Sequence, residues 1–302
     1  MRPVPRGASC RSAAENIAIV GVAIFVAACA SAAPNPSATA PATAAVATQA
    51  LSTTPPAGPP TTESTELGPH LSLVGLGDSV PGGLKCNDPC RSYVLTYGVL
   101  AATALGEAVV TTNLATNDSL ESDTLLDRVK NRDEYRTAID GADIVTLQVG
   151  WNDWQRPCNF DNRTSCLALG IGRVMPNVDA ILSELAARRA GKPTAIRMIT
   201  YYNGFLGNAQ TPGIWGFQAE PSNVELFDKD FRAALADFNR MLCNLAAGHD
   251  ALCVEVGAAF NGTHLDQAAA PGLINSDGIH GLRAGQDLIA KVLDDAGYAP
   301  LR

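Results

Sequence analysis

The sequence predicts an α/β protein built as a three-layer α/β/α sandwich around a five-stranded parallel sheet. From about residue 70 onward, short apolar segments alternate with longer helical patterns. The apolar segments are nearly continuous hydrophobic runs bounded by turn residues, which is typical of buried strands. They span residues 71–76, 108–114, 143–149, 194–202 and 251–256. Strands that alternate with helices favour right-handed crossovers and hence a parallel sheet covered on both faces.

The helical patterns between these strands are equally regular. They cover residues 93–105, 123–130, 133–140, 174–189, 227–247 and 284–296. The helix at 174–189 is strongly amphipathic and is followed by a Gly-Lys-Pro stop signal. Residues 203–225 form a long irregular segment rich in Pro and aromatic residues, and a binding loop and a surface insertion both remain open for it.

The 302 residues divide into three parts. Residues 1–28 form a leader, in which arginines precede an apolar run too short to span a bilayer comfortably. Residues 30–68 are rich in Ala, Pro, Thr and Ser and carry almost no charge, so burial there cannot offset the entropy of ordering. We expect a disordered linker at 30–68 and one globular domain at 69–302.

The leader ends in Val26-Ala27-Ala28-Cys29, which is similar to a bacterial lipobox. Such a motif implies that Cys29 is lipidated and that two acyl chains anchor the protein. An ordinary cleavage site after small residues is the alternative, and it would release the protein. We therefore expect an exported protein, either lipid-anchored to the outer face of a bacterial membrane or secreted.

The net charge restricts the classes of binding partner, and the cysteines indicate the redox compartment. The net charge of −8 argues against nucleic acid, because there is no basic stripe to neutralise phosphates, and we expect a soluble monomer. Eight cysteines in an exported chain indicate an oxidising compartment. Cys10 lies in the leader and Cys29 at its end, and proximity predicts disulfides among the other six: Cys86/Cys90, Cys158/Cys166 and Cys243/Cys253. The alternative, a zinc site, needs a ligand spacing that these pairs lack, so no metal and no cofactor are expected.

A candidate nucleophile follows the first strand. Residues 71–76 run into a Gly77-Asp78-Ser79 turn, which puts the Ser79 hydroxyl at the carboxyl end of a buried strand. Open α/β sheets bind their ligands at that end. Gly-Asp-Ser by itself is common loop chemistry, so the assignment depends on partners elsewhere in the chain.

Nucleophilic catalysis by a serine needs a base, a group that orients the base, and donors for the developing oxyanion. Asp277 and His280 lie three residues apart just before the last helix. The carboxylate can therefore hold the imidazole Nδ1–H and leave Nε2 free to take the Ser79 proton.

Asn152 is the candidate oxyanion donor, because it follows the strand at 143–149 and Gly150 allows a close turn there. An Asx turn formed by Asn152 and Asp153 is the structural alternative. Trp151 and Trp154 flank this segment, and a core position is favoured for them over a substrate pocket.

Taken together, three segments resemble the sequence blocks of the SGNH (GDSL-type) hydrolase family. They are, in chain order, residues 77–79 (Gly-Asp-Ser), 150–153 (Gly-Trp-Asn-Asp) and 277–280 (Asp-Gly-Ile-His). The resemblance covers about residues 70–300 and implies a flavodoxin-like fold and carboxylic ester hydrolysis. It further implies that Ser79 is the nucleophile, His280 the base and Asp277 its partner. The implied oxyanion donors are the Ser79 N–H, a backbone N–H of the family's second block and the Asn152 side chain.

The second block departs from the family, whose Gly is missing from residues 113–120. Counting forward from Asn113 places the donor at Asp118, whereas counting back from Leu125 places it at Ser119. Either residue supplies a backbone N–H, but a carboxylate at that position would oppose a developing negative charge. Ser119 is therefore our candidate for this donor.

Two functions of different class remain open. The first is an extracytoplasmic serine esterase that acts on small-molecule, lipid or polysaccharide esters. The second is a catalytically silent, ligand-binding lipoprotein on the same fold, which the missing Gly favours and the intact site residues oppose. A metal-dependent hydrolase, the third possibility, lacks a recognisable ligand set.

Overall fold

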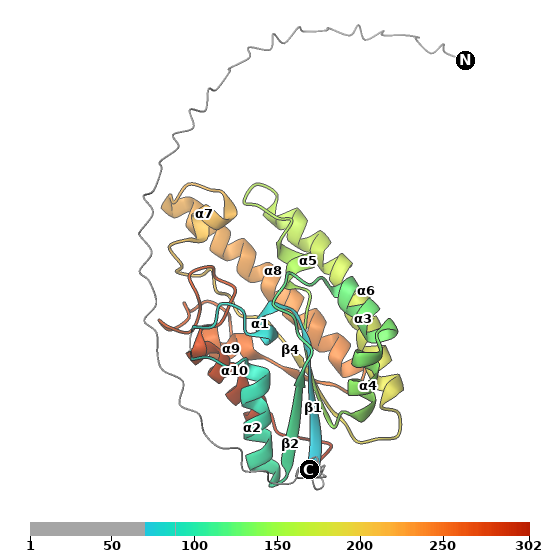
Figure 1. Cartoon of the computed structure of the whole chain (residues 1–302). Helices are drawn as coiled ribbons and strands as arrows, with labels where there is room; N and C mark the ends of the chain where they lie inside the picture. Colours follow the sequence, from blue (N-terminus) through green and yellow to red (C-terminus); the bar gives the residue numbers. More distant parts are fainter. Residues whose placement is uncertain (1–69, 88) are drawn as a thin grey trace, which may run out of the picture. The chain divides into compact units, whose positions relative to one another are not determined.

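The computed structural model describes residues 70–87 and 89–302. The leader at 1–28, the lipidation site Cys29 and the linker at 30–68 lie outside the described residues, so the expectations about them stay predictions. Figure 1 shows the described part as a twisted sheet with helices packed on both sides.

The sheet contains five strands, all of them parallel, in the order β2-β1-β3-β4-β5. Its strands are β1 (His70–Gly77), β2 (Ala108–Asn113), β3 (Ile144–Gln148), β4 (Ala195–Ile199) and β5 (Leu252–Val254). This order and the parallel pairing confirm the predicted flavodoxin-like sandwich.

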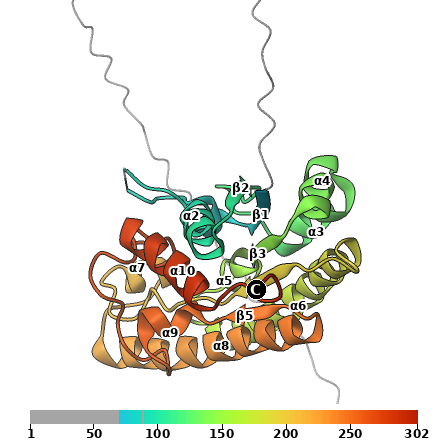
Figure 2. The ribbon, with the colours of Figure 1, turned by 90° about the horizontal axis from the view of Figure 1, so that it is seen from below.

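The helices divide between the two faces of the sheet. On one face lie α2 (Tyr93–Leu105), α9 (Val256–Asn261) and α10 (Arg283–Asp295). On the other lie α3 (Ser122–Asn131), α4 (Asp133–Gly141), α5 (Trp151–Gln155), α6 (Arg163–Arg188) and α8 (Pro221–Gly248). Two short helices, α1 (Ser79–Gly82) and α7 (Thr211–Trp215), complete the set. In Figure 2 the strands separate α2 and α10 from α3, α4 and α6.

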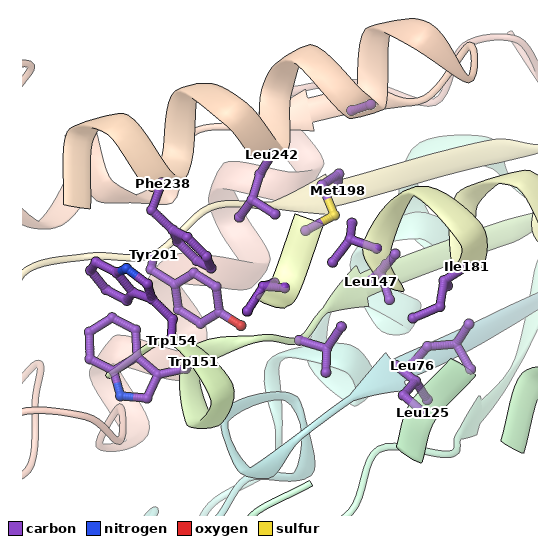
Figure 3. Packing of buried hydrophobic residues seen from close by; sticks show 14 of the residues in the cluster. Leu76, Leu125, Leu147, Trp151, Trp154, Ile181, Met198, Tyr201, Phe238 and Leu242 are labelled. Carbon is purple, nitrogen blue, oxygen red and sulfur yellow. The ribbon is translucent and has the colours of Figure 1, made fainter. Parts of the chain in front are cut away.

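Each face has its own apolar core, because the strands are covered on both sides. Neighbouring residues of β4 show the division: Met198 packs among the residues facing α6 and α8, and Ile199 packs among those facing α2 and α10. Figure 3 shows the first cluster, in which Trp154 stacks on Phe238 with 4.5 Å between ring centroids. Trp151 and Trp154 are both buried, which confirms their predicted core position.

Two helix predictions are wrong at their bounds. α7 and the first turn of α8 lie within residues 203–225, where the sequence predicts irregular structure. The larger difference is at α6. It begins at Arg163 rather than near residue 174. Gly170 and Gly172 lower the helix propensity of its first turns, so the sequence does not predict them as helical. Tertiary packing nevertheless stabilises the helix there. By length and composition α6 is the one described helix that is apolar enough to cross a membrane, but 44% of that apolar window is buried in the protein.

The six cysteines of the domain pair as predicted. The Cα–Cα separations are 5.7 Å for Cys86–Cys90, 5.5 Å for Cys158–Cys166 and 5.0 Å for Cys243–Cys253. The third bridge joins the long helix α8 to the edge strand β5, whereas the first closes a small loop after α1.

The chain's last residues are held by a buried arginine of the sheet. Arg197 in β4 is 2% exposed, and its Nη2 donates to the carbonyls of Gly297 at 2.7 Å and Ala299 at 3.0 Å. Arg302 lies 3.5 Å from Glu107, the residue just before β2. The C-terminus is therefore fastened at the amino ends of the strands.

Candidate active site

The carboxyl ends of β1 and β3 lie side by side, because Gly77 pairs with Gln148 in the parallel ladder. Ser79 comes two residues after this pair and Asn152 four residues after it. The topology therefore brings the candidate nucleophile and the candidate oxyanion donor to the same edge of the sheet, as the sequence predicts.

Ser79 is the first residue of the short helix α1, so its backbone N–H has no acceptor within that helix. Asp78 caps the helix, and its Oδ1 accepts the Val80 N–H at 3.2 Å. Two amide side chains from other elements donate hydrogen bonds to carbonyls of α1. Gln286 donates to the Val80 carbonyl at 3.1 Å, and Asn113 donates to the Pro81 carbonyl at 2.9 Å.

His280 reaches Ser79 from a loop that precedes α10. Its Nε2 lies 2.9 Å from Ser79 Oγ, and its Nδ1 lies 2.7 Å from Asp277 Oδ2. The Tyr202 hydroxyl donates to the Ile279 carbonyl at 2.6 Å and so supports the loop from the end of β4. The structure thus brings together the three side chains that the sequence analysis singled out.

The donors and acceptors fix the direction of the hydrogen bonds from Ser79 through His280 to Asp277. The Asp277 carboxylate can only accept, so Nδ1 carries the proton and Nε2 is left to accept from Ser79. Burial alone would raise the pKa of Asp277, but hydrogen bonds from His280, from two backbone N–H groups and from Lys85 outweigh it and hold that pKa well below its usual range. The carboxylate is therefore ionised at any pH at which the imidazole can act as a base.

Asn152 lies in the first turn of α5, two residues after Gly150, whose φ of +117° favours glycine. One hydrogen of its amide is donated to the Leu120 carbonyl at 2.9 Å. An amide has two such hydrogens, so this bond uses one of them. The next residue, Asp153, accepts the Ser122 N–H at 2.9 Å and the Ser122 hydroxyl at 2.7 Å, which clamps the segment after Ser119 against α5.

The second-block segment lies against α1 at Thr116 and Asn117. A Cβ added at Gly82 would meet Asn117 Oδ1 at 2.5 Å and the Thr116 carbonyl at 3.0 Å. The Asp118 carboxylate is engaged by the Thr116 hydroxyl and lies 3.9 Å from Arg128. Ser119 is exposed, and its role as the third oxyanion donor stays a prediction.

Asp78 is the most perturbed acid of the site. It is 1% exposed, and its Oδ2 is buried without a hydrogen-bond partner. Burial, countered by the Val80 N–H and assisted by the charge of Asp153, raises the pKa of Asp78 to about 7. This carboxyl therefore loses its proton close to neutral pH, directly beside the nucleophile.

A polar hollow of about 810 Å³ adjoins Asn152. Arginines and carboxylates share its wall, which includes Arg156, Arg173 and Asp123. Three carboxylates of this region, Glu121, Asp123 and Asp153, have oxygens within 4.8 Å of one another. Of these three acids, Asp153 is bonded to Ser122.

Lys85 is the residue of the site that sequence reasoning missed. Its Nζ lies 2.9 Å from Asp277 Oδ2, across 192 positions of sequence. A single lysine after a turn carries no pattern that predicts such a contact.

Comparison with known proteins supports the same architecture. No family model and no curated protein matches the chain. Among solved structures, a lipase from a goat rumen metagenome superposes with a TM-score of 0.61 and 21% identity over 77% of this chain and 100% of that one. The acetylxylan esterase Axe2 from Geobacillus stearothermophilus superposes with a TM-score of 0.52 and 17% identity over 74% of this chain and 92% of that one.

At these identities the likeness establishes the fold. The chain shares the α/β fold of these two structures, and membership of the family that its three sequence segments resemble stays a prediction.

Proposed function

We propose that this protein is a serine carboxylic ester hydrolase in which Ser79 is the nucleophile, His280 the general base and Asp277 the residue that orients the base. The observation that carries the proposal is the continuous chain from Ser79 Oγ through the imidazole to the Asp277 carboxylate, with steps of 2.9 and 2.7 Å. Both distances are within the range at which a serine nucleophile is activated.

The reaction proceeds in two halves. Ser79 Oγ attacks the ester carbonyl while its proton passes to His280 Nε2, and the resulting tetrahedral intermediate collapses to an acyl-serine. The leaving alcohol takes the proton from the imidazolium. Water then attacks the acyl group with His280 again as base, and the carboxylic acid leaves with the Ser79 hydroxyl restored.

The oxyanion of each tetrahedral intermediate is stabilised by the Ser79 N–H and by the second amide hydrogen of Asn152. A backbone N–H near Ser119 is the proposed third donor. The bonds of Asn152 to Leu120 and of Asp153 to Ser122 support this arrangement, because they fix α5 against the second-block segment before substrate arrives.

We propose further that the enzyme acts outside the cytoplasm, held by a lipid on Cys29. The lipobox-like leader motivates this location, and three disulfides in the domain fit an oxidising compartment.

The decisive experiment is hydrolysis of chromogenic acyl esters of increasing chain length by the purified chain, with Ser79→Ala as the inactive control. We expect turnover by the parent and a loss of at least about 10³-fold in the variant. Acetylated xylo-oligosaccharides belong in the same panel, because the structural neighbours include a lipase and an acetylxylan esterase and the hollow beside Asn152 is polar. Equal inertness of both proteins on the whole panel would instead indicate a ligand-binding protein.

A further inference from the structure

The Asp277 carboxylate contacts a lysine ammonium as well as the imidazole. Asp277 Oδ2 lies 2.7 Å from His280 Nδ1 and 2.9 Å from Lys85 Nζ. The other oxygen, Oδ1, accepts the backbone N–H groups of Ile279 at 2.9 Å and His280 at 3.0 Å. Four donors thus surround one carboxylate, and one of them is the Lys85 ammonium.

The loop that carries Lys85 is built to present it. Lys85 has a φ of +56°, a left-handed conformation that is rare for residues with a side chain. The next residue, Cys86, is bridged to Cys90, and Asn87 Oδ1 accepts the Arg283 N–H at 3.1 Å. Two contacts from this loop, through Lys85 and Asn87, therefore reach the segment that holds the acid–base pair. Backbone strain at such a position is typical of a functional site.

The ammonium acts on the proton affinity of the imidazole. A carboxylate stabilises an imidazolium, whereas a nearby ammonium repels it and competes for the same carboxylate oxygen. Other charged or titratable groups nearby are Asp78 beside Ser79, the phenol of Tyr202, which bonds to the Ile279 carbonyl, and Arg283, which faces Asp287 on α10. Burial raises the pKa of Tyr202, which stays neutral, and Asp78 is uncharged on the acid side of neutrality. Lys85 is thus the cation in direct contact with the carboxylate that would stabilise an imidazolium.

We propose that Lys85 is a positioning residue of the esterase: by sharing the Asp277 carboxylate with His280, it keeps the imidazole free to act as a base at lower pH. This inference rests on the proposed function and extends it to the pH range in which the enzyme works. It assigns a role in the site to the turn that follows α1, just before Cys86.

The test is the pH dependence of kcat/KM, from pH 4.5 to 9, for the full chain and for Lys85→Met. We expect the midpoint of the acidic limb to move up by about half a pH unit in the variant, as one charge about 5 Å away in a watery environment predicts. The activity loss is then about three-fold on the acid side and fades toward alkaline pH. Lys85→Arg should restore the parent profile.

The matched control is Lys291→Met on α10, which removes the same charge from an exposed pair with Asp295. Its profile should superpose on that of the parent. A Lys85→Met profile that superposes on the parent, or that falls equally at every pH, would overturn the inference while leaving the esterase intact. An inert parent enzyme would instead overturn the proposed function.

A second readout does not depend on turnover. Titration of the His280 ring by NMR, with the resonance assigned by His280→Asn, follows imidazole protonation directly. In Lys85→Met the ring should protonate at higher pH than in the parent, and an unchanged titration would contradict the proposal.

Discussion

At the scale of single residues, Asp78 and Asp277 show how differently one fold treats two carboxylates a short distance from the same serine. Asp277 receives four donors, and Asp78 is buried with one oxygen unpartnered. The pKa of Asp277 is lowered, and the pKa of Asp78 is raised to about 7. Environment decides the direction, as expected when hydrogen bonding and desolvation oppose each other.

Asp78→Asn should change the pH dependence of stability. The folded-state pKa of about 7 lies above the ordinary value of 3.8, so the stability associated with Asp78 is complete below about pH 4 and is lost as the pH rises through 7. Asparagine stays neutral. We therefore expect the free energy of unfolding of the variant, relative to the parent, to rise by roughly 2–4 kcal/mol between pH 4 and pH 8.

Guanidinium denaturation at both pH values measures this difference. Asp237→Asn, at an exposed carboxylate on α8, is the control and should show no such trend. The expectation is contradicted if the free energies of unfolding of Asp78→Asn and of the parent differ by the same amount at pH 4 and at pH 8.

Asn152→Ala tests the oxyanion donor. We expect kcat to fall by about 10²–10³ with little change in KM, because the amide bonds more strongly to the intermediate than to the substrate. Steady-state kinetics on a short acyl ester provide the measurement. Asn244→Ala, an exposed asparagine on α8, should leave both constants unchanged. A rise in KM with kcat intact would assign Asn152 to substrate binding instead.

At the scale of elements, the segment after β4 supports the loop that carries the acid–base pair. Gly204 packs so tightly there that an added Cβ would lie 2.2 Å from the Gly278 carbonyl oxygen. Asn208 donates to the Ser276 carbonyl at 3.1 Å, and Tyr202 bonds to Ile279. Residues 203–225, for which the sequence left two interpretations open, thus begin with a structural support of the site.

Gly204→Ala should displace this loop and separate His280 from Ser79. We expect kcat to fall by about 10- to 100-fold, since a shift on the order of 1 Å is enough to spoil such geometry. The matched control is Gly213→Ala in α7, where an added Cβ meets nothing within 4 Å. Kinetics and thermal melting of both variants decide the matter, and equal activity of the two would refute the support role.

The sequence predicts these elements unevenly. The strand ending at Gly77 and the motifs at Ser79, Asn152 and His280 are local patterns, and the structure places them as expected. The start of α6 depends on tertiary packing across two weak helix formers. Helix propensity alone therefore predicts the start too far along the chain. Lys85 is beyond reach for a stronger reason: its contact joins residues 192 positions apart and depends on one side chain in a left-handed turn.

At the scale of the whole molecule, one sheet with a core on each face is reinforced by three covalent links. Removal of the Cys243–Cys253 bridge by double substitution to Ser should lower the free energy of unfolding by about 2–3 kcal/mol, because the unfolded chain gains conformational entropy when this loop is opened. The Cys86–Cys90 double variant should lose less, since its loop is shorter and lies at the surface. Chemical denaturation of both variants gives the comparison, and a reversed ranking would contradict it.

The fastening of the last residues by Arg197 has a practical consequence. Gly297, Ala299 and Arg302 are held at the amino ends of the strands, whereas Ser79 and His280 lie beyond the carboxyl end of β1. In Figure 1 the C-terminus and α1 accordingly lie at opposite ends of β1. A matrix or fusion partner coupled through the final residue would therefore leave the end of the sheet with Ser79 and His280 exposed to solvent. Trimming the chain back past residue 297 would strip a buried guanidinium of two acceptors and destabilise the very end used as a handle.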